Sequence, residues 1–373
     1  MTISTKAIAA LLVSSLTVVT AYVIFSLALR VNPLEALSEV GIFGAASVFA
    51  GLTVGELVRA LRLYLLVHFV GARASLSSAL TARLLGNLSG LLSPGSIAAE
   101  PTRVAVLISL NRIEVEKAFA AGLLESFYDA VVLSALTLAV GVIMLPKTAF
   151  AVLVSALLLI VWVAGLVATA REESPMLRLL ERLARRFPRI SGELSRRYAY
   201  FARVLSRTMG LSLHAAAFFT TLLAQYAQAL GLAALLKYSP GEGPPAEPSS
   251  LVLLVGALSS TYVMSVMPTP GGSGFFELGL AAFLGERITV TWRALFLLFT
   301  VSGALASSFP LFRARRDLLR RALESLYLAE KPAGSTERDP RGTRKLRASL
   351  RPTKRAYAPS WHSNNLPAAR QEG

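Results

Sequence analysis

Two acidic residues, Glu125 and Asp129, lie within an apolar run of the sequence, AGLLESFYDAVVL. Their spacing of four residues places both carboxylates on one face of a helix. A charged group at the centre of a bilayer costs at least about 2.5 kcal/mol, so such residues face a partner or a wet cavity rather than lipid. Glu100 and Arg103 follow a nearby break in the apolar pattern. We therefore predict a polar cavity in which Arg103 and these carboxylates meet a charged lipid headgroup.

Two apolar regions of the chain are interrupted by similar Pro-Gly sequences. The first is SPGSIAAE at 93–100, which contains Pro94 and Gly95, and the second is TPGGSGFFE at 269–277. Each consists of a hydroxyl residue, Pro-Gly, a few small or apolar residues and then Glu. Paired broken segments are typical of inverted-repeat transporters, whose substrates bind at the breaks. Coincidence is the alternative, because Pro-Gly is common in loops.

The second break is rich in glycine and precedes an acidic residue. It contains Pro270, Gly271, Gly272 and Gly274 and is followed by Glu277. A helix that begins there would point free N–H groups and the positive end of its dipole at the cavity, which suits a phosphate. A tight hairpin without a ligand is the alternative. No Gly-Lys-Ser/Thr follows the glycines, so the sequence is not a nucleotide-binding loop.

Other polar residues in apolar segments have plainer explanations. Asn87 could bind a lipid headgroup or satisfy the backbone. Gln225 and Gln228 are expected to bond between helices. Glu56 and Arg59 lie at the end of an apolar span, where their side chains are expected to reach the membrane interface.

These residues must be positioned by helices that cross a membrane. Six apolar runs are long enough to span the hydrocarbon core, namely 7–29, 36–58, 118–145, 148–170, 209–236 and 290–311. The broken regions 84–101 and 250–285 are predicted to be re-entrant. The predicted fold is all-α: a polytopic helical membrane protein with about six full spans and two broken helical hairpins in an inverted-repeat arrangement.

The distribution of arginine and lysine predicts the topology. Basic residues in 59–83, 102–117, 171–208 and the tail place these segments in the cytoplasm. The loop 238–249 has two Glu and no basic residue, so it is expected outside. Both termini are then cytoplasmic, and the hairpins enter from opposite faces of the plasma membrane. We expect a membrane domain over 1–321 with an amphipathic basic helix in 174–208, and a basic, disordered tail over 322–373.

Composition excludes several function classes. The chain has 373 residues, 54% hydrophobic and 16% charged, with three His and no Cys. These numbers exclude cysteine chemistry and a large soluble enzyme, and no metal site or cofactor is expected. The net charge of +16 arises beside apolar spans, which favours anionic lipid headgroups at the cytoplasmic face over nucleic acid as the partner.

The residues named above resemble the flippase-like transmembrane domain of lysylphosphatidylglycerol synthases. The similarity covers about residues 5–320 and rests on the Glu100–Arg103 element and the Pro-Gly-Gly-x-Gly…Glu element. The sequence departs from the family pattern at Ala98-Ala99 and at Ser126-Phe127-Tyr128. The resemblance implies a stand-alone translocation module that lacks the aminoacyl-transferase domain.

Three functions therefore compete. The first is a flippase-like transporter of a phospholipid or a polyprenyl-phosphate-linked lipid. The second is an intramembrane enzyme that uses Glu125 or Asp129 as a general base. The third is a non-catalytic scaffold for a lipid-modifying partner enzyme. Association of several copies of the chain is compatible with all three.

Overall fold

The computed structural model describes residues 5–170, 200, 202, 211–238 and 249–330. Contacts divide the chain into two units, Met1–Leu319 and Arg320–Gly373. In the second unit, only the end of one helix is described. The predicted amphipathic helix in 174–208 and the predicted disordered tail lie outside the described residues apart from isolated positions, so these predictions and the boundary at residue 321 stay predictions.

The first unit is built of helices. In chain order they are α1 (Thr5–Ala28), α2 (Pro33–Phe69), α3 (Leu76–Leu91), α4 (Ala99–Asn111), α5 (Val115–Gly141), the 3₁₀ turn η1 (Val142–Met144), α6 (Ala149–Ala170), α9 (Leu211–Tyr238), α10 (Ser249–Met264), α11 (Phe275–Leu284) and α12 (Glu286–Glu330), which continues into the second unit. The described residues contain no strand beyond one isolated bridge between Pro94 and Pro270. The prediction of an all-α polytopic membrane protein is confirmed.

Local sequence explains where the early helices begin and bend. Asn32 caps α2 by accepting a hydrogen bond from the N–H of Leu34, and Pro33 fills the first helical position. Gly41 interrupts α2 with a φ of 64°, which produces a kink. Ser75 and Ser78 form a reciprocal cap at the start of α3. These signals fix the helix directions near the site.

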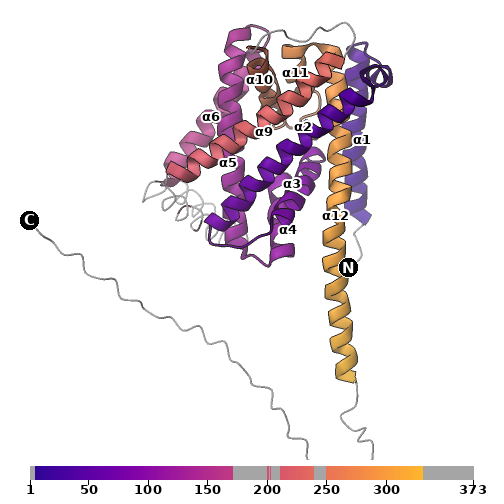
Figure 1. The fold of residues 1–373 in the computed structure, drawn as a ribbon, viewed down its shortest axis with the longest axis vertical. Coiled ribbons are helices and arrows are strands. Elements are labelled where there is room, and N and C mark those ends of the chain that lie inside the picture. The colour runs from indigo at the N-terminus through magenta and orange to yellow at the C-terminus, as the bar shows by residue number, and fades with distance from the viewer. Residues whose placement is uncertain (1–4, 171–199, 201, 203–210, 239–248, 331–373) are drawn as a thin grey trace, which may run out of the picture. The chain divides into compact units, whose positions relative to one another are not determined.

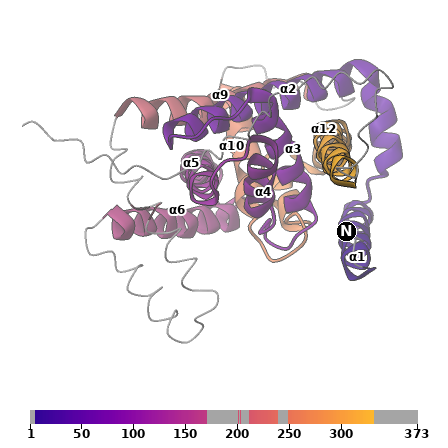
Figure 2. The same ribbon diagram turned by 90° about the horizontal axis from the view of Figure 1, so that it is seen from below.

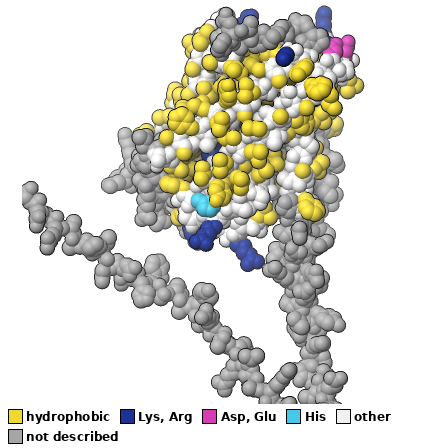
Figure 3. Space-filling model, in the orientation of Figure 1, with side chains coloured by type: hydrophobic (Ala, Val, Ile, Leu, Met, Phe, Trp, Pro, Cys, Tyr) yellow, Lys and Arg dark blue, Asp and Glu magenta, His cyan; other side chains and the backbone are white. Residues whose placement is uncertain are grey.

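Four helices in the described part of the chain are long and apolar enough to cross a membrane, within α2, α5, α9 and α12. The apolar portions of α1 and α6 that the structure describes are shorter, at Ser15–Ala28 and Ala149–Gly165. The number of six full crossings therefore stays a prediction. Hydrophobic side chains cover the face shown in Figure 3, and most visible Lys and Arg lie near its two ends, as expected of a surface that faces lipid.

The two broken segments form helical hairpins that meet inside the unit. The α3–α4 hairpin lies in the lower part of the view in Figure 1, and α10 and α11 lie in the upper part. Their tips are joined by the backbone, because Gly95 N–H donates to Met267 O (3.1 Å) and Gly271 N–H donates to Ser93 O (3.2 Å). The hairpins thus approach from opposite ends and touch at their Pro-Gly breaks.

The helices α2 and α9 pack closely against each other beside the hairpins. A Cβ atom added to Gly51 would lie 2.8 Å from Ala227 O and 3.0 Å from Gly231 Cα. The small residues therefore let the two backbones approach closely, as is common in membrane helix pairs. Figure 2 shows α2 and α9 running together along one edge of the unit, next to the hairpins.

Candidate functional site

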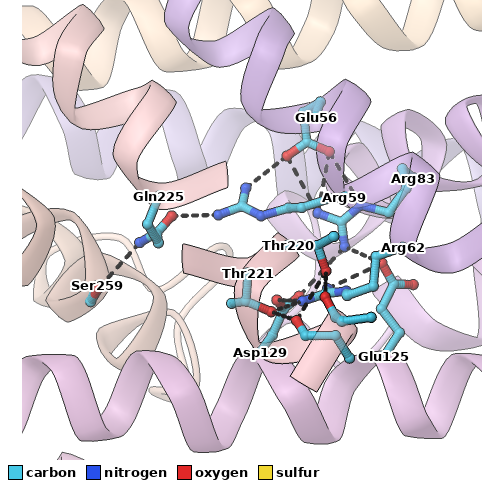
Figure 4. A network of polar contacts seen from close by, with 12 residues as sticks. Glu56, Arg59, Arg62, Arg83, Glu125, Asp129, Thr220, Thr221, Gln225 and Ser259 are labelled. Atoms are coloured by element: carbon cyan, nitrogen blue, oxygen red, sulfur yellow. Dashed lines mark hydrogen bonds and ion pairs between the residues drawn. The ribbon is translucent and has the colours of Figure 1, made fainter. Parts of the chain in front are cut away.

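A network of buried charged and polar side chains joins six helices beside the hairpin tips. Glu56 on α2 accepts hydrogen bonds from Arg59 on the same helix (2.9 Å) and from Arg83 on α3 (Nε, 3.2 Å). Arg59 also donates to Gln225 Oε1 on α9 (2.5 Å), and Gln225 donates to Ser259 on α10 (3.2 Å). Figure 4 shows these side chains converging between the helices.

The acidic pair of α5 lies at the centre of this network. Arg62 Nη1 is 2.7 Å from Asp129 Oδ1, and Arg83 Nη1 donates to Glu125 Oε1 at 2.9 Å. Arg62 also lies 3.4 Å from Glu125 and donates to Thr221 on α9. Two arginines from different helices therefore neutralise two carboxylates that are spaced one helical turn apart.

The first break contributes a fourth arginine. Arg103 on α4 pairs with Glu100 and donates to Asn87 Oδ1 on α3 at 3.1 Å. Its Nη1 atom is also 3.8 Å from Glu125 Oε2. Glu100 packs against α5 at Gly122, where an added Cβ would lie 2.8 Å from the carboxylate oxygen. Because α5 has a glycine there, the carboxylate can sit between the two helices.

A separate ion pair supports the second break. Arg293 Nε on α12 is 2.9 Å from Glu277 Oε1 on α11, and both side chains are almost fully buried. Arg293 Nη2 donates to Ser273 Oγ (3.3 Å) and to Gly271 O (3.4 Å). Its guanidinium carbon lies 4.1 Å from the centre of the Phe276 ring. The arginine thereby fixes the glycine-rich loop and stacks on an aromatic face.

A cavity of about 340 Å³ lies between the two breaks. Its charged lining residues include Glu56, Arg59, Arg83, Arg103 and Asp129. Its aromatic lining residues include Trp162, Tyr262, Phe276, Trp292 and Phe296. Pockets of about 300–1,000 Å³ that combine apolar walls with a few polar groups are usual binding sites for small molecules. The cavity is large enough for a polar headgroup and provides both charges and aromatic faces to it.

Positive and negative groups balance in the described network. It contains four arginines and four carboxylates, namely Arg59, Arg62, Arg83, Arg103, Glu56, Glu100, Glu125 and Asp129. Pairing offsets the desolvation that each charge suffers on burial. No group of acidic or histidine side chains suited to a metal ion occurs among the described residues. The carboxylates instead face arginines.

The family model for the Lysylphosphatidylglycerol synthase TM region matches residues 7–291. The chain belongs to this family. The resemblance inferred from the two Pro-Gly breaks and their glutamates is therefore confirmed, and the chain is a membrane protein related to lipid handling. Neither a curated protein nor a solved structure matches it. All predicted site residues lie within the part of the chain that matches this TM region, whereas Arg293 lies just beyond it.

Within this TM region the structure brings most of the predicted site residues together. The cavity wall includes Asn87, Gly95, Glu100, Arg103, Asp129 and Gly271. Glu125 contacts three of the arginines without reaching the wall, and Pro94 and Pro270 form the bridge between the hairpin tips. Gly272, Gly274 and Glu277 lie behind the wall in the second break. The role of all the predicted site residues in binding a substrate stays a prediction.

The structure differs from the expected phosphate cradle at the start of α11. Gly274 N–H donates to Glu277 Oε2 at 2.6 Å, and Phe276 N–H donates to Gly272 O at 2.8 Å. The helix is thus capped by its own carboxylate, which satisfies a donor that would otherwise be free. These bonds stabilise the hairpin, and Arg293 on α12 is the charged side chain beside this break that lines the cavity.

The expected positions of three arginines and one glutamate on α2 and α3 were wrong. The sequence predicts a cytoplasmic connection over 59–83, which includes Arg59, Arg62 and Arg83, and it places Glu56 with Arg59 at the membrane interface. All four side chains are buried in the network. The reason is that α2 continues to Phe69, so residues 56–62 lie on a helix that faces α3 and α5.

A signal for these residues was present in the sequence. Glu56, Arg59 and Arg62 recur every three residues, which places them on one helix face. Arg83 and Arg293 each lie alone in an apolar run, the same criterion that identifies Glu125 and Asp129. Gln225 does bond between helices, as predicted; it also joins the wall of the cavity.

Proposed function

We propose that the protein moves a phospholipid or a polyprenyl-phosphate-linked lipid between leaflets, with the headgroup passing through the cavity between the hairpins. The observation that carries the proposal is the charge-balanced cavity at the point where two broken hairpins from opposite ends touch. Irregular backbone at membrane depth is tolerated where it is covered by protein or lines a wet cavity. A headgroup there would leave its hydrocarbon chains in the bilayer.

Two arginines of the cavity are suited to exchange a partner for a lipid phosphate. Arg103 donates to the neutral amide of Asn87, and Arg59 donates to the neutral amide of Gln225. Replacing an amide by a phosphate leaves no carboxylate unpaired, while arginine gains a charge-assisted bond. Arg62 is less suited to this exchange, because it does not line the cavity and is held by the two carboxylates of Glu125 and Asp129.

The ion pairs weaken the case for an enzyme with a carboxylate base. Each of the two acids of α5 lies within 3.6 Å of two arginine side chains. A general base must accept a proton from its substrate, and a carboxylate held by two cations accepts one poorly. The sequence also contains no nucleotide-binding loop, so we propose that a gradient of the lipid or of ions drives the movement.

Substitution of Asn87 by Asp tests this function without removing an arginine. The new carboxylate would bind Arg103 permanently and compete with the lipid phosphate. Since a charged hydrogen bond contributes about 1.5–3 kcal/mol, we expect translocation to slow by about tenfold or more. The assay follows fluorescent phosphatidylglycerol in vesicles that contain the full-length protein, using a membrane-impermeant quencher to report the outer leaflet.

Asn32→Asp is the matched control, because Asp caps a helix as well as Asn does and residue 32 lies outside the cavity. This variant should translocate lipid as the wild type does. Translocation by the wild type no faster than in protein-free vesicles, or equal rates for Asn87→Asp and wild type, would defeat the proposal. A larger decrease of the translocation rate in Asn32→Asp than in Asn87→Asp would show that reduced helix stability, and not competition for Arg103, slows translocation.

A further inference from the structure

A second, mostly apolar groove lies outside the charged cavity. It is bounded by α2, α3 and α12 and has a volume of about 420 Å³. Its walls include Leu57 on α2, Leu80 and Leu84 on α3, and Phe299 and Gly303 on α12. Figure 2 shows α12 beside α3, with α2 along the adjacent edge. Two of these helices, α2 and α12, are long and apolar enough to cross a membrane.

The surroundings of the groove select a hydrocarbon as its occupant. The neighbouring side chains of Leu298 and Leu305 on α12 are 55% and 68% exposed, as expected where a helix faces lipid. The hydroxyl of Thr53 donates to Phe49 O (2.7 Å), and that of Ser307 donates to Ala304 O (3.0 Å). These two polar groups of the groove are thus satisfied by their own helices, and most of the surface left to a ligand is apolar.

Glu56 connects the groove to the charged cavity, because it lines both. Its carboxylate is held by Arg59 and Arg83, which neutralise its charge next to the groove. An amphiphile that extends past Glu56 from the groove into the cavity would have its apolar part against α3 and α12 and its polar part among the arginines. Among the residues that the structure describes, no other charged side chain lines the groove.

We propose that this groove holds one hydrocarbon chain of the lipid whose headgroup enters the cavity. The inference rests on the proposed function and adds a binding site for the chain, on one side of the protein, between α2, α3 and α12. The occupant is the transported lipid itself. A bilayer lipid that merely fills the groove is the competing outcome of the test.

Gly303 keeps the groove open, and this residue offers the substitution. A Cβ atom added there would already lie 3.2 Å from Leu84 Cδ2 on the opposite wall, so a larger side chain fills the space. Ser302 is the neighbouring residue on the same helix, is exposed and does not line the groove. Gly303→Trp and Ser302→Trp therefore form a matched pair, and Ala306→Trp fills the groove from a more exposed position.

The experiment uses phosphatidylglycerol with a photoreactive diazirine near the end of one chain. The full-length protein is placed in phosphatidylcholine vesicles with this probe, irradiated and digested, and labelled peptides are identified by mass spectrometry. We expect labels on α3 and α12 in the wild type and in Ser302→Trp. Labelling should fall by about tenfold in Gly303→Trp and Ala306→Trp, since losing the burial of even two methylene groups has that effect on binding.

The same vesicles report translocation, which separates the two proposals. Reduced labelling together with slowed translocation in both groove-filling variants supports the transported lipid as occupant. Reduced labelling with unchanged translocation identifies a resident bilayer lipid and overturns the inference while leaving the proposed function intact. Unchanged labelling also overturns it. If the wild type does not translocate lipid at all, the proposed function fails, and the inference that depends on it fails too.

Discussion

A buried arginine stabilises this protein only as long as its carboxylate partners are present. Arg62 illustrates the dependence, because it is 1% exposed and pairs with both acids of α5. Removing one partner from such a pair leaves an uncompensated charge, whereas replacing the whole pair by apolar residues is often neutral. The paired substitution should therefore cost less stability than the single one.

We expect Arg62→Met to lower the free energy of unfolding by about 3–5 kcal/mol. Adding Asp129→Leu should recover part of this loss, because Glu125 is still paired with Arg83. Denaturant-induced unfolding of the detergent-solubilised protein measures both effects. Lys117→Met is the control, since the Lys117–Glu114 pair is exposed and contributes at most about 1 kcal/mol. Equal losses in Arg62→Met and Lys117→Met would show that the network does not stabilise the fold.

The sequence identified the acids of the site more readily than its arginines. Glu125 and Asp129 lie deep in a run that is unmistakably a membrane span, so their burial is predictable. Arg59 and Arg62 follow the apolar part of α2, where arginine equally well marks a loop. Only the packing of α3 and α5 against α2 decides between these cases, and a single sequence does not contain that packing.

At the scale of elements, the hairpin tips depend on glycines with positive φ. Gly272 has a φ of 66°, and an added Cβ would lie 2.5 Å from Ser265 Cα and 2.7 Å from Met264 O. Gly71 has a similar φ of 74°, but no atom lies within 4 Å of its added Cβ. The two positions thus separate the conformational requirement of a glycine from the requirement for close backbone contact.

Gly272→Ala should destabilise the protein more than Gly71→Ala. Both pay the cost of an alanine in the left-handed region, about 1–2 kcal/mol, and Gly272→Ala must also displace the backbone of α10. Thermal unfolding in detergent should therefore show the lower midpoint for Gly272→Ala. Equal midpoints would mean that the second hairpin rearranges freely and that the close contact is not needed.

The existence of the hairpins was predictable, but their details were not. Proline and glycine at 94–95 and 270–271 indicate chain breaks in any context. The continuation of α2 to Phe69 was missed, because polar residues at 56–62 lower the apolar character that marks a span. The kink at Gly41 was missed as well. The cap formed by Glu277 depends on the φ of Gly274, which residue types alone do not specify.

On the scale of the whole molecule, the connections lie at two ends of the helical unit. The connection after α2 lies at the lower end in Figure 1, and the connection between α5 and α6 lies at the upper end. Arg73 and Lys147 are exposed residues of these two connections. Basic residues are more frequent in cytoplasmic loops, and the predicted topology places Arg73 inside and Lys147 outside.

Single cysteines can test this topology directly, because the chain contains none. In intact cells a membrane-impermeant maleimide should label Lys147→Cys, whereas Arg73→Cys should react only after permeabilisation. Labelling in denatured protein controls for the presence of each thiol. Reaction of both cysteines from the same side would contradict the arrangement of two hairpins that enter from opposite faces.

Charge balance between distant helices also constrains how the protein is made. The helices α2 and α3 bring Arg59, Arg62 and Arg83 into the membrane with Glu56 as their nearest acid, and Glu125 follows Arg83 by 42 residues. A newly synthesised chain that ends before α5 would hold uncompensated cations at a depth where each costs about 2.5–3.5 kcal/mol. We therefore expect α2 and α3 to become stable in the bilayer only once α5 has joined them, so that the first half of the protein inserts as one cooperative unit.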